Sequence, residues 1–110
     1  MKLAIIGSRN IIEISIKEYI PSGVTEIVSG GARGVDTLAK NFATEMGIPL
    51  IEFLPKYNLY GRAAPIKRNE EIAQYADEAL VFWDGVSKGT QHTIKYFEKL
   101  GKRVTLIIKN

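Results

Sequence analysis

The chain has 110 residues, of which 45% are hydrophobic and 25% charged, and its net charge is +3. These values are typical of one soluble globular domain, over residues 1–110, that buries a core without metal or disulfide support. No apolar run approaches the roughly 20 residues of a membrane span, and we expect no signal peptide and no membrane partner. The chain has no cysteine, which excludes disulfides and favours a cytoplasmic location.

The first elements predicted from the N-terminus are a strand, a helix, a second strand and a second helix. Residues 2–6 form a short apolar run typical of a strand. Residues 11–20 fit a helical stripe but also alternate like a strand; we predict a helix, because a crossover must join two parallel strands. An apolar run predicts a strand over residues 24–29. Residues 35–46 predict the most regular helix, with apolar side chains at helical spacing.

The remaining elements continue the alternation of strands and helices. They are a strand over residues 48–54, a loop over 55–65, a helix over 66–76, a strand over 78–83, a helix over 90–100 and a strand over 104–108. This order predicts an α/β fold with a doubly wound, five-stranded parallel sheet and helices on both faces. Such sheets bind ligands at the carboxyl ends of the strands, where the strand order reverses. If the first and fourth strands are neighbours, the loops after the first, second and fourth strands face one crevice.

A glycine-rich turn, Ser-Gly-Gly-Ala-Arg-Gly-Val-Asp, covers residues 29–36 between the second strand and its helix. Glycines let main-chain N–H groups approach a ligand, and a helix N-terminus favours a phosphate. Arg33 adds a forked cation inside the turn. We therefore interpret the turn as a phosphate-binding loop, with a purely structural tight turn as the alternative. Its spacing matches neither the dinucleotide fingerprint nor the P-loop, which argues against NAD-linked hydride transfer and NTP hydrolysis.

A second glycine-rich turn, over residues 84–90, follows the fourth strand. Thr90 fits either a phosphate donor or a simple helix cap. Asp84 fits a turn residue first and a ligand contact second. Four arginines lie in segments punctuated by glycine or proline, which favours a converging anion site. They are Arg9, Arg33, Arg62 and Arg68.

Other candidate residues have both a functional and a structural interpretation. Asp36 is expected to stabilise the dipole of its helix, with holding the loop or contacting a ribose as the alternatives. His92, the single histidine, is expected to be structural or on the surface. Tyr57 and Tyr60 lie in the longest loop, where they either stack on a base or form an ordinary packed lid. No second histidine or any cysteine is available for a zinc site, so we expect no metal.

Four motifs, taken in order, resemble the SLOG superfamily (DprA/SMF–LOG), which includes the DNA-processing protein DprA and the LOG phosphoribohydrolases. The chain is most similar to its small single-domain members related to YpsA. The motifs are Gly7-Ser8-Arg9, residues 29–36, Arg68-Asn69 and residues 84–90. The resemblance covers nearly the whole chain. It implies a Rossmann-like three-layer sandwich, a crevice for a nucleotide or nucleotide-derived ligand, no certain cofactor, and a homodimer.

The resemblance favours binding over catalysis. The LOG pattern P-G-G-x-G-T-x-x-E carries a glutamate that serves glycosidic cleavage, and Thr93 stands in its place here. We therefore expect binding, or sensing, of a phosphorylated nucleotide derivative. One alternative is a LOG-type nucleoside-monophosphate phosphoribohydrolase with a displaced acid, Asp84 or Asp36. Another is DprA-like binding of single-stranded nucleic acid, although the net charge is only +3.

The expected ligand-binding residues come from all four motifs. They are Gly7, Ser8, Arg9, Ser29, Gly30, Gly31, Ala32, Arg33, Gly34, Asp36, Arg68, Asn69, Asp84, Gly85, Ser87, Gly89 and Thr90. Tyr57 or Tyr60 would cover the base.

Overall fold

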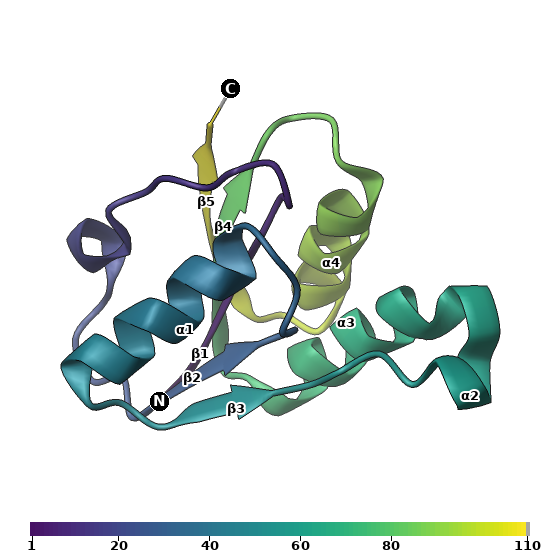
Figure 1. Cartoon of the computed structure of the whole chain (residues 1–110), viewed down its shortest axis with the longest axis horizontal. Coiled ribbons are helices and arrows are strands. Elements are labelled where there is room, and N and C mark those ends of the chain that lie inside the picture. The colour runs from purple at the N-terminus through teal and green to yellow at the C-terminus, as the bar shows by residue number, and fades with distance from the viewer. Residues whose placement is uncertain (110) are drawn as a thin grey trace.

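The computed structural model describes residues 1–109 and has an α/β fold, with one sheet between two layers of helices (Figure 1). The strands are β1 (Lys2–Gly7), β2 (Glu26–Ser29), β3 (Leu50–Glu52), β4 (Glu78–Trp83) and β5 (Arg103–Ile108). The helices are α1 (Val35–Met46), α2 (Tyr57–Tyr60), α3 (Ala64–Tyr75) and α4 (Lys88–Lys99), with 3-10 turns η1 (Ile16–Tyr19) and η2 (Gly61–Ala63). All strand pairs are parallel. The predicted doubly wound, Rossmann-like three-layer sandwich is confirmed.

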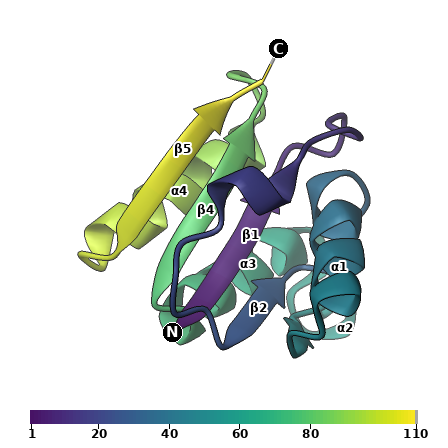
Figure 2. The same ribbon diagram turned by 90° about the vertical axis from the view of Figure 1, so that its left-hand side faces the viewer.

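The strand order is β3-β2-β1-β4-β5, so β1 lies at the centre, between β2 and β4 (Figure 2). The chain moves outward from β1 to β3 and then returns to the other side of β1 to form β4. This reversal makes β1 and β4 neighbours, which is the condition under which the loops after β1, β2 and β4 were expected to face one crevice. At the end of the β1–β4 pair, Gly7 lies opposite Phe82, and the N–H of Ser8 donates to the carbonyl oxygen of Phe82 at 3.0 Å. The loops after β1 and β4 therefore start side by side.

The two faces of the sheet bury separate apolar cores. One face packs against α1 and the segment that contains η1, and its largest buried side chain is Phe82. The other face packs against α3 and α4, with Phe97 fully buried. Burial on both faces explains the nearly continuous apolar sequence of β4. None of the helices within residues 1–109 is long and apolar enough to cross a membrane.

The helix predicted over residues 11–20 is wrong. This segment contains only the single 3-10 turn η1 and otherwise runs as irregular chain. Ile11 and Ile16 are buried against the sheet, whereas Ile12 is 74% exposed. The segment is rich in isoleucine, whose β-branched side chain lowers helix propensity. A few anchored isoleucines therefore cover this part of the sheet without a regular helix.

Several predicted boundaries also change. The helix predicted from residue 66 begins at Ala64, because Pro65 stands in its first turn, where a missing N–H costs nothing. The last helix begins at Lys88, two residues before its predicted start. The loop predicted over residues 55–65 contains α2 and η2, which have no buried residue and project from the body in Figure 1. The strand predicted over residues 48–54 is only Leu50–Glu52.

Candidate functional site

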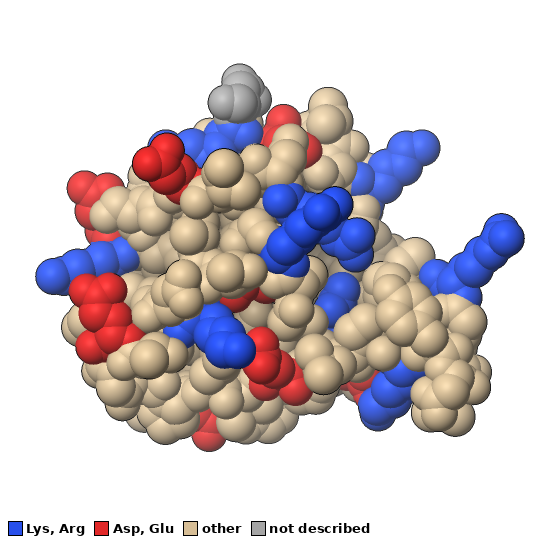
Figure 3. Space-filling view, in the orientation of Figure 1, with Lys and Arg blue, Asp and Glu red and all other residues tan. Residues whose placement is uncertain are grey.

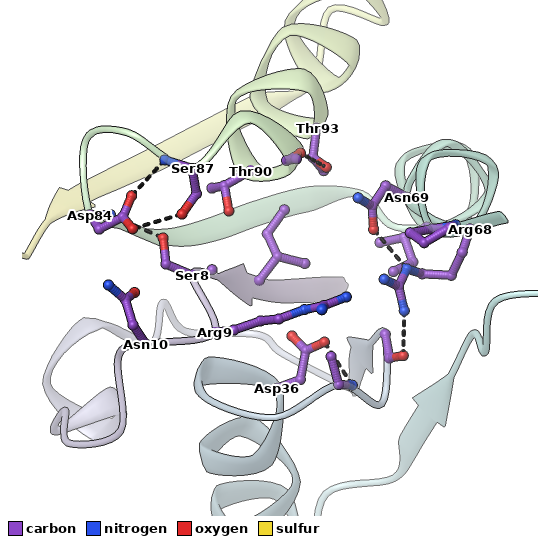
Figure 4. A pocket seen from close by; sticks show the side chains of 17 residues that line it. Ser8, Arg9, Asn10, Asp36, Arg68, Asn69, Asp84, Ser87, Thr90 and Thr93 are labelled. Atoms are coloured by element: carbon purple, nitrogen blue, oxygen red, sulfur yellow. Dashed lines mark hydrogen bonds between the residues drawn. The ribbon is translucent and has the colours of Figure 1, made fainter. Parts of the chain in front are cut away.

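A cavity of about 480 Å³ opens at the carboxyl edge of the sheet (Figure 4). The loops after β1, β2 and β4 all contribute to its wall, which confirms their predicted convergence. α3 also contributes to the wall, through Pro65, Arg68, Asn69 and Ile72, which the convergence of the three loops alone did not predict. Lys and Arg side chains gather near the middle of the face in Figure 3, where α1, α3 and α4 converge. We call this space the first cavity.

Most of the predicted ligand-binding residues lie on the wall of the first cavity. They are Gly7, Ser8, Arg9, Gly30, Ala32, Asp36, Arg68, Asn69, Asp84, Ser87, Gly89 and Thr90. Five others of the described chain lie outside this wall: Ser29, Gly31, Arg33, Gly34 and Gly85. The wall also includes residues that the motifs did not single out as contacts, namely Ile6, Asn10, Pro65, Ile72 and Thr93. Of these, Asn10 could have been predicted from the sequence, because it directly follows the motif Gly7-Ser8-Arg9.

The glycines of the loop over residues 29–36 make room for other parts of the protein. A Cβ on Gly30 would lie 2.7 Å from Nη1 of Arg68 and 3.0 Å from Oδ2 of Asp36. A Cβ on Gly34, which has a φ of +77°, would lie 2.5 Å from the carbonyl oxygen of Arg9. These two positions fit the structural interpretation of the loop. Because Gly30 and Gly34 have no side chain, Arg68 and the backbone of Arg9 can pack directly against the loop.

Asp36 connects the glycine loop to α1. Asp36 is 8% exposed, and its Oδ2 accepts a hydrogen bond from the N–H of Ala32 at 3.1 Å. Burial raises the pKa of Asp36, while the Ala32 hydrogen bond and the charges of Arg68 and Arg9 partly oppose this shift. Asp36 therefore holds the loop, as in the alternative interpretation, and presents a carboxylate to the cavity (Figure 4).

Arg68 is a buried cation that spans from α3 to the glycine loop. It is 6% exposed; Nη1 donates to the carbonyl oxygen of Gly30 at 2.6 Å, and Nε donates to Oδ1 of Asn69 at 2.8 Å. Burial lowers the pKa of Arg68, the charge of Asp36 opposes that shift, and the charge of Arg9 adds to it. In Figure 4 the side chain of Arg9 extends across the cavity toward Arg68. Two like charges therefore converge on one space.

Asp84 organises the loop after β4. Oδ1 accepts hydrogen bonds from the N–H groups of Val86 and Ser87 at 2.9 and 2.8 Å, and Oδ2 accepts one from Oγ of Ser87 at 2.7 Å. These bonds hold the pKa of Asp84 far below its ordinary value. The interpretation of Asp84 as a turn residue is confirmed. A carboxylate held in this form is a poor proton donor, so the geometry argues against Asp84 as the displaced acid.

The N-terminus of α4 faces the first cavity without a side-chain cap. Its N-cap residue is Ser87, whose hydroxyl is bonded to Asp84 and makes no cap hydrogen bond. The interpretation of Thr90 as the cap is wrong, because the helix begins two residues before it and places Thr90 in the first turn, buried beside the cavity. The first N–H groups of a helix have no partner within it. Gly89 and Thr90 therefore present donors to the cavity.

Two remaining polar residues occupy structural positions near the cavity. Thr93 is buried and donates its hydroxyl proton to the carbonyl oxygen of Gly89 at 2.9 Å. His92 lies on α4, with Nε2 3.3 Å from Oε2 of Glu70 on α3, which fits the structural role expected of it. Within residues 1–109, no group of three or more His, Cys, Asp and Glu side chains could hold a metal ion.

A second cavity, of about 310 Å³, adjoins the first. The two share the wall formed by Arg9, Gly30, Ala32 and Arg68. The rest of the second wall comes from the glycine loop and from the segment before α3: Gly31, Arg33, Pro55 and Tyr57. Arg33 and Tyr57 are thus brought together at the second cavity. Tyr60, also part of the described chain, lies outside both walls.

Comparison of the chain with protein-family models, with curated proteins and with solved structures gives no match.

The raised pKa of Asp36 predicts a defined pH dependence of stability. The folded protein keeps the Asp36 proton to a higher pH than the unfolded chain does. The corresponding stabilisation is complete below the unfolded pKa of about 3.9 and is lost as the pH rises through the folded pKa. Asp36→Asn removes this loss. We expect the free energy of unfolding of the variant, minus that of the wild type, to increase from about pH 4 upward and then level off.

Urea unfolding at a series of pH values measures this difference. The charged groups that face Asp36 are Arg9, Arg68 and Glu52, and all three remain in the variant. A constant difference between the two proteins across the pH range would contradict the assignment of the shift to Asp36.

Proposed function

We propose that the first cavity binds a nucleotide or a nucleotide-derived phosphorylated ligand. The observation that carries this proposal is the convergence of Arg9 and Arg68 on a cavity that the uncapped N-terminus of α4 also faces. Guanidinium groups and helix N-termini both favour phosphate oxygens. The volume of about 480 Å³ falls within the range of roughly 300–1,000 Å³ found for small-molecule sites.

The polar groups of the cavity match the parts of a nucleotide. The amides of Gly89 and Thr90 would bind phosphate oxygens, with Arg9 closing over them from the opposite loop. Asp36 presents a carboxylate, which accepts hydrogen bonds and would suit ribose hydroxyls rather than a phosphate. The buried Arg68 offsets the charge of that carboxylate. The expected order within the cavity therefore runs from the phosphate at α4 to the sugar near Asp36.

Arg9→Gln is the direct test of the phosphate contact. Arg9 is exposed, so its replacement should leave the fold intact while weakening AMP binding at least about tenfold, equivalent to 1.4 kcal/mol. Titration calorimetry with AMP measures the change. The matched control is Lys40→Gln, which removes an exposed cation from α1 outside both cavity walls of the described chain. If Arg9→Gln and Lys40→Gln bind AMP equally well, the phosphate contact of Arg9 is wrong. If the wild-type protein binds no mononucleotide, the proposal itself fails.

A LOG-type phosphoribohydrolase is the second candidate function. It is favoured by Asp36, a cavity carboxylate whose raised pKa suits proton transfer. Incubation with AMP, followed by chromatography for free adenine, tests this alternative directly. Adenine that appears with the wild-type protein but not with Asp36→Asn would establish the enzyme. If AMP binds and no adenine is released, the hydrolase alternative is wrong and the proposal of ligand binding stands.

A further inference from the structure

The second cavity continues the first across a wall that carries two cations. Arg9 and Arg68 border both spaces, and Arg33 adds a third guanidinium on the far side. In a complex with a mononucleotide, the single phosphate would lie at the N-terminus of α4, with Arg9 closing over it. Arg68 in the shared wall and Arg33 beyond it would then face no phosphate.

The arginines at the shared wall already repel each other. The positive charge of Arg9 lowers the pKa of Arg68, which is itself buried. Asp36 offsets part of this charge, but its carboxylate also accepts a hydrogen bond from the N–H of Ala32. An anionic group of the ligand placed between Arg9 and Arg68 would relieve the repulsion. The wall between the cavities is therefore suited to a second phosphate.

Beyond that wall, the second cavity offers an aromatic surface. Tyr57 is 58% exposed and belongs to α2, a four-residue helix without a buried residue. Pro55 adds a second apolar surface, and both residues lie on the same cavity wall as Arg33. An exposed aromatic ring beside a cation suits a sugar or a base that is attached to a phosphate.

We propose that the ligand is a nucleoside diphosphate whose second phosphate is esterified to a further sugar or nucleoside, and that the second cavity holds this distal group. The inference rests on the proposed function, because the nucleoside monophosphate half would occupy the first cavity. The pyrophosphate would then span from the N-terminus of α4 to Arg9 and Arg68. Tyr57 and Arg33 would select for the distal group.

Titration calorimetry with AMP, ADP and ADP-ribose at one ionic strength tests the proposal. We expect ADP-ribose to bind at least about tenfold more tightly than AMP, with ADP in between. If AMP and ADP-ribose bind equally, the distal site is wrong and the proposed function stands. If ADP equals ADP-ribose, the gain comes from charge alone, and the second cavity holds no distal group. If none of the three binds, the proposed function itself fails.

Variants of the second cavity separate the two halves of the ligand. Tyr57→Leu and Arg33→Gln should each remove most of the preference for ADP-ribose and leave AMP binding unchanged. Tyr60→Leu and Arg62→Gln are matched controls, since both are exposed residues of the same described segment and lie outside the two walls. Equal ADP-ribose affinity in all four variants would overturn the assignment.

A short single-stranded oligonucleotide is the last probe. Steep salt dependence with tighter binding than ADP-ribose, lost in Tyr57→Leu, would mean that the second cavity serves a nucleic-acid strand and would overturn the proposal. Weaker binding of the oligonucleotide than of ADP-ribose, at the same salt concentration, is the expected result.

Discussion

Arg68→Met is expected to lower the free energy of unfolding by about 3 kcal/mol, because it removes a buried cation whose charge offsets that of the buried Asp36 and so leaves the Asp36 carboxylate uncompensated. In the wild type, the guanidinium donates to the carbonyl oxygen of Gly30 at 2.6 Å and offsets the charge of Asp36. Methionine fills a similar space and has a similar helix propensity, but it satisfies neither group. Thermal unfolding should therefore occur about 12 °C lower, at about 4 °C for each kcal/mol.

Two further variants decide the cause of this loss. Lys67→Met changes the neighbouring cation on the exposed side of α3, where the ion pair to Glu70 is long, at 3.9 Å, and it should cost less than about 0.5 kcal/mol. The double variant Arg68→Met, Asp36→Asn should recover part of the stability, because the uncompensated carboxylate is gone. A loss no larger than that of Lys67→Met would show that Arg68 does not hold the loop.

Gly34→Ala is expected to destabilise the fold by about 3 kcal/mol, by combining backbone strain with a steric clash. Gly34 has φ and ψ of 77° and −127°, a conformation that L side chains rarely adopt. A Cβ there would lie within 2.7 Å of the backbone carbonyl carbon and Cα of Arg9. Backbone atoms of a neighbouring loop cannot move aside as a flexible side chain can. The change should therefore also displace Arg9 and weaken ligand binding.

Gly61→Ala is the matched control for this variant. Gly61 has nearly the same conformation, with φ and ψ of 55° and −128°, but a Cβ there would meet no atom within 4 Å. It should therefore show the backbone strain alone, about 1–2 kcal/mol. Chemical denaturation of both variants gives the excess that belongs to the contact with Arg9. Equal losses in the two variants would show that the contact between the loops contributes nothing to stability.

Local sequence patterns predicted most of the elements that carry the site. α1 and β4 have the predicted bounds, Val35–Met46 and Glu78–Trp83, because α1 has an uninterrupted helical periodicity and β4 is a nearly continuous apolar run followed by a glycine-rich turn. The helix predicted over residues 11–20 was wrong, since the isoleucines of this segment fit both the helical and the strand periodicity. There the contact of Ile11 and Ile16 with the sheet decided the structure.

The functions of individual site residues depended on partners far along the chain. The glycine loop resembled a self-contained phosphate cradle, but Gly30 accommodates Arg68, 38 residues away, and Gly34 accommodates Arg9. From the sequence, Asp84 was a candidate acid, but its carboxylate accepts hydrogen bonds from the N–H groups of Val86 and Ser87 and organises the turn instead. No spacing rule links Arg33 to Tyr57, which meet at the second cavity because β3 leads the chain past the glycine loop before α3 begins.

The sequence by itself determined the fold class, the two glycine-rich turns and the arginines near them, because periodicity and turn chemistry depend on residues a few positions apart. The tertiary structure alone decided which glycines make room for other parts of the protein, which carboxylate is held by hydrogen bonds within its own turn, and that a second cavity shares the arginine wall. Those features depend on strand order and on the packing of α3 against the sheet. Both are set by long-range burial, which no local pattern encodes.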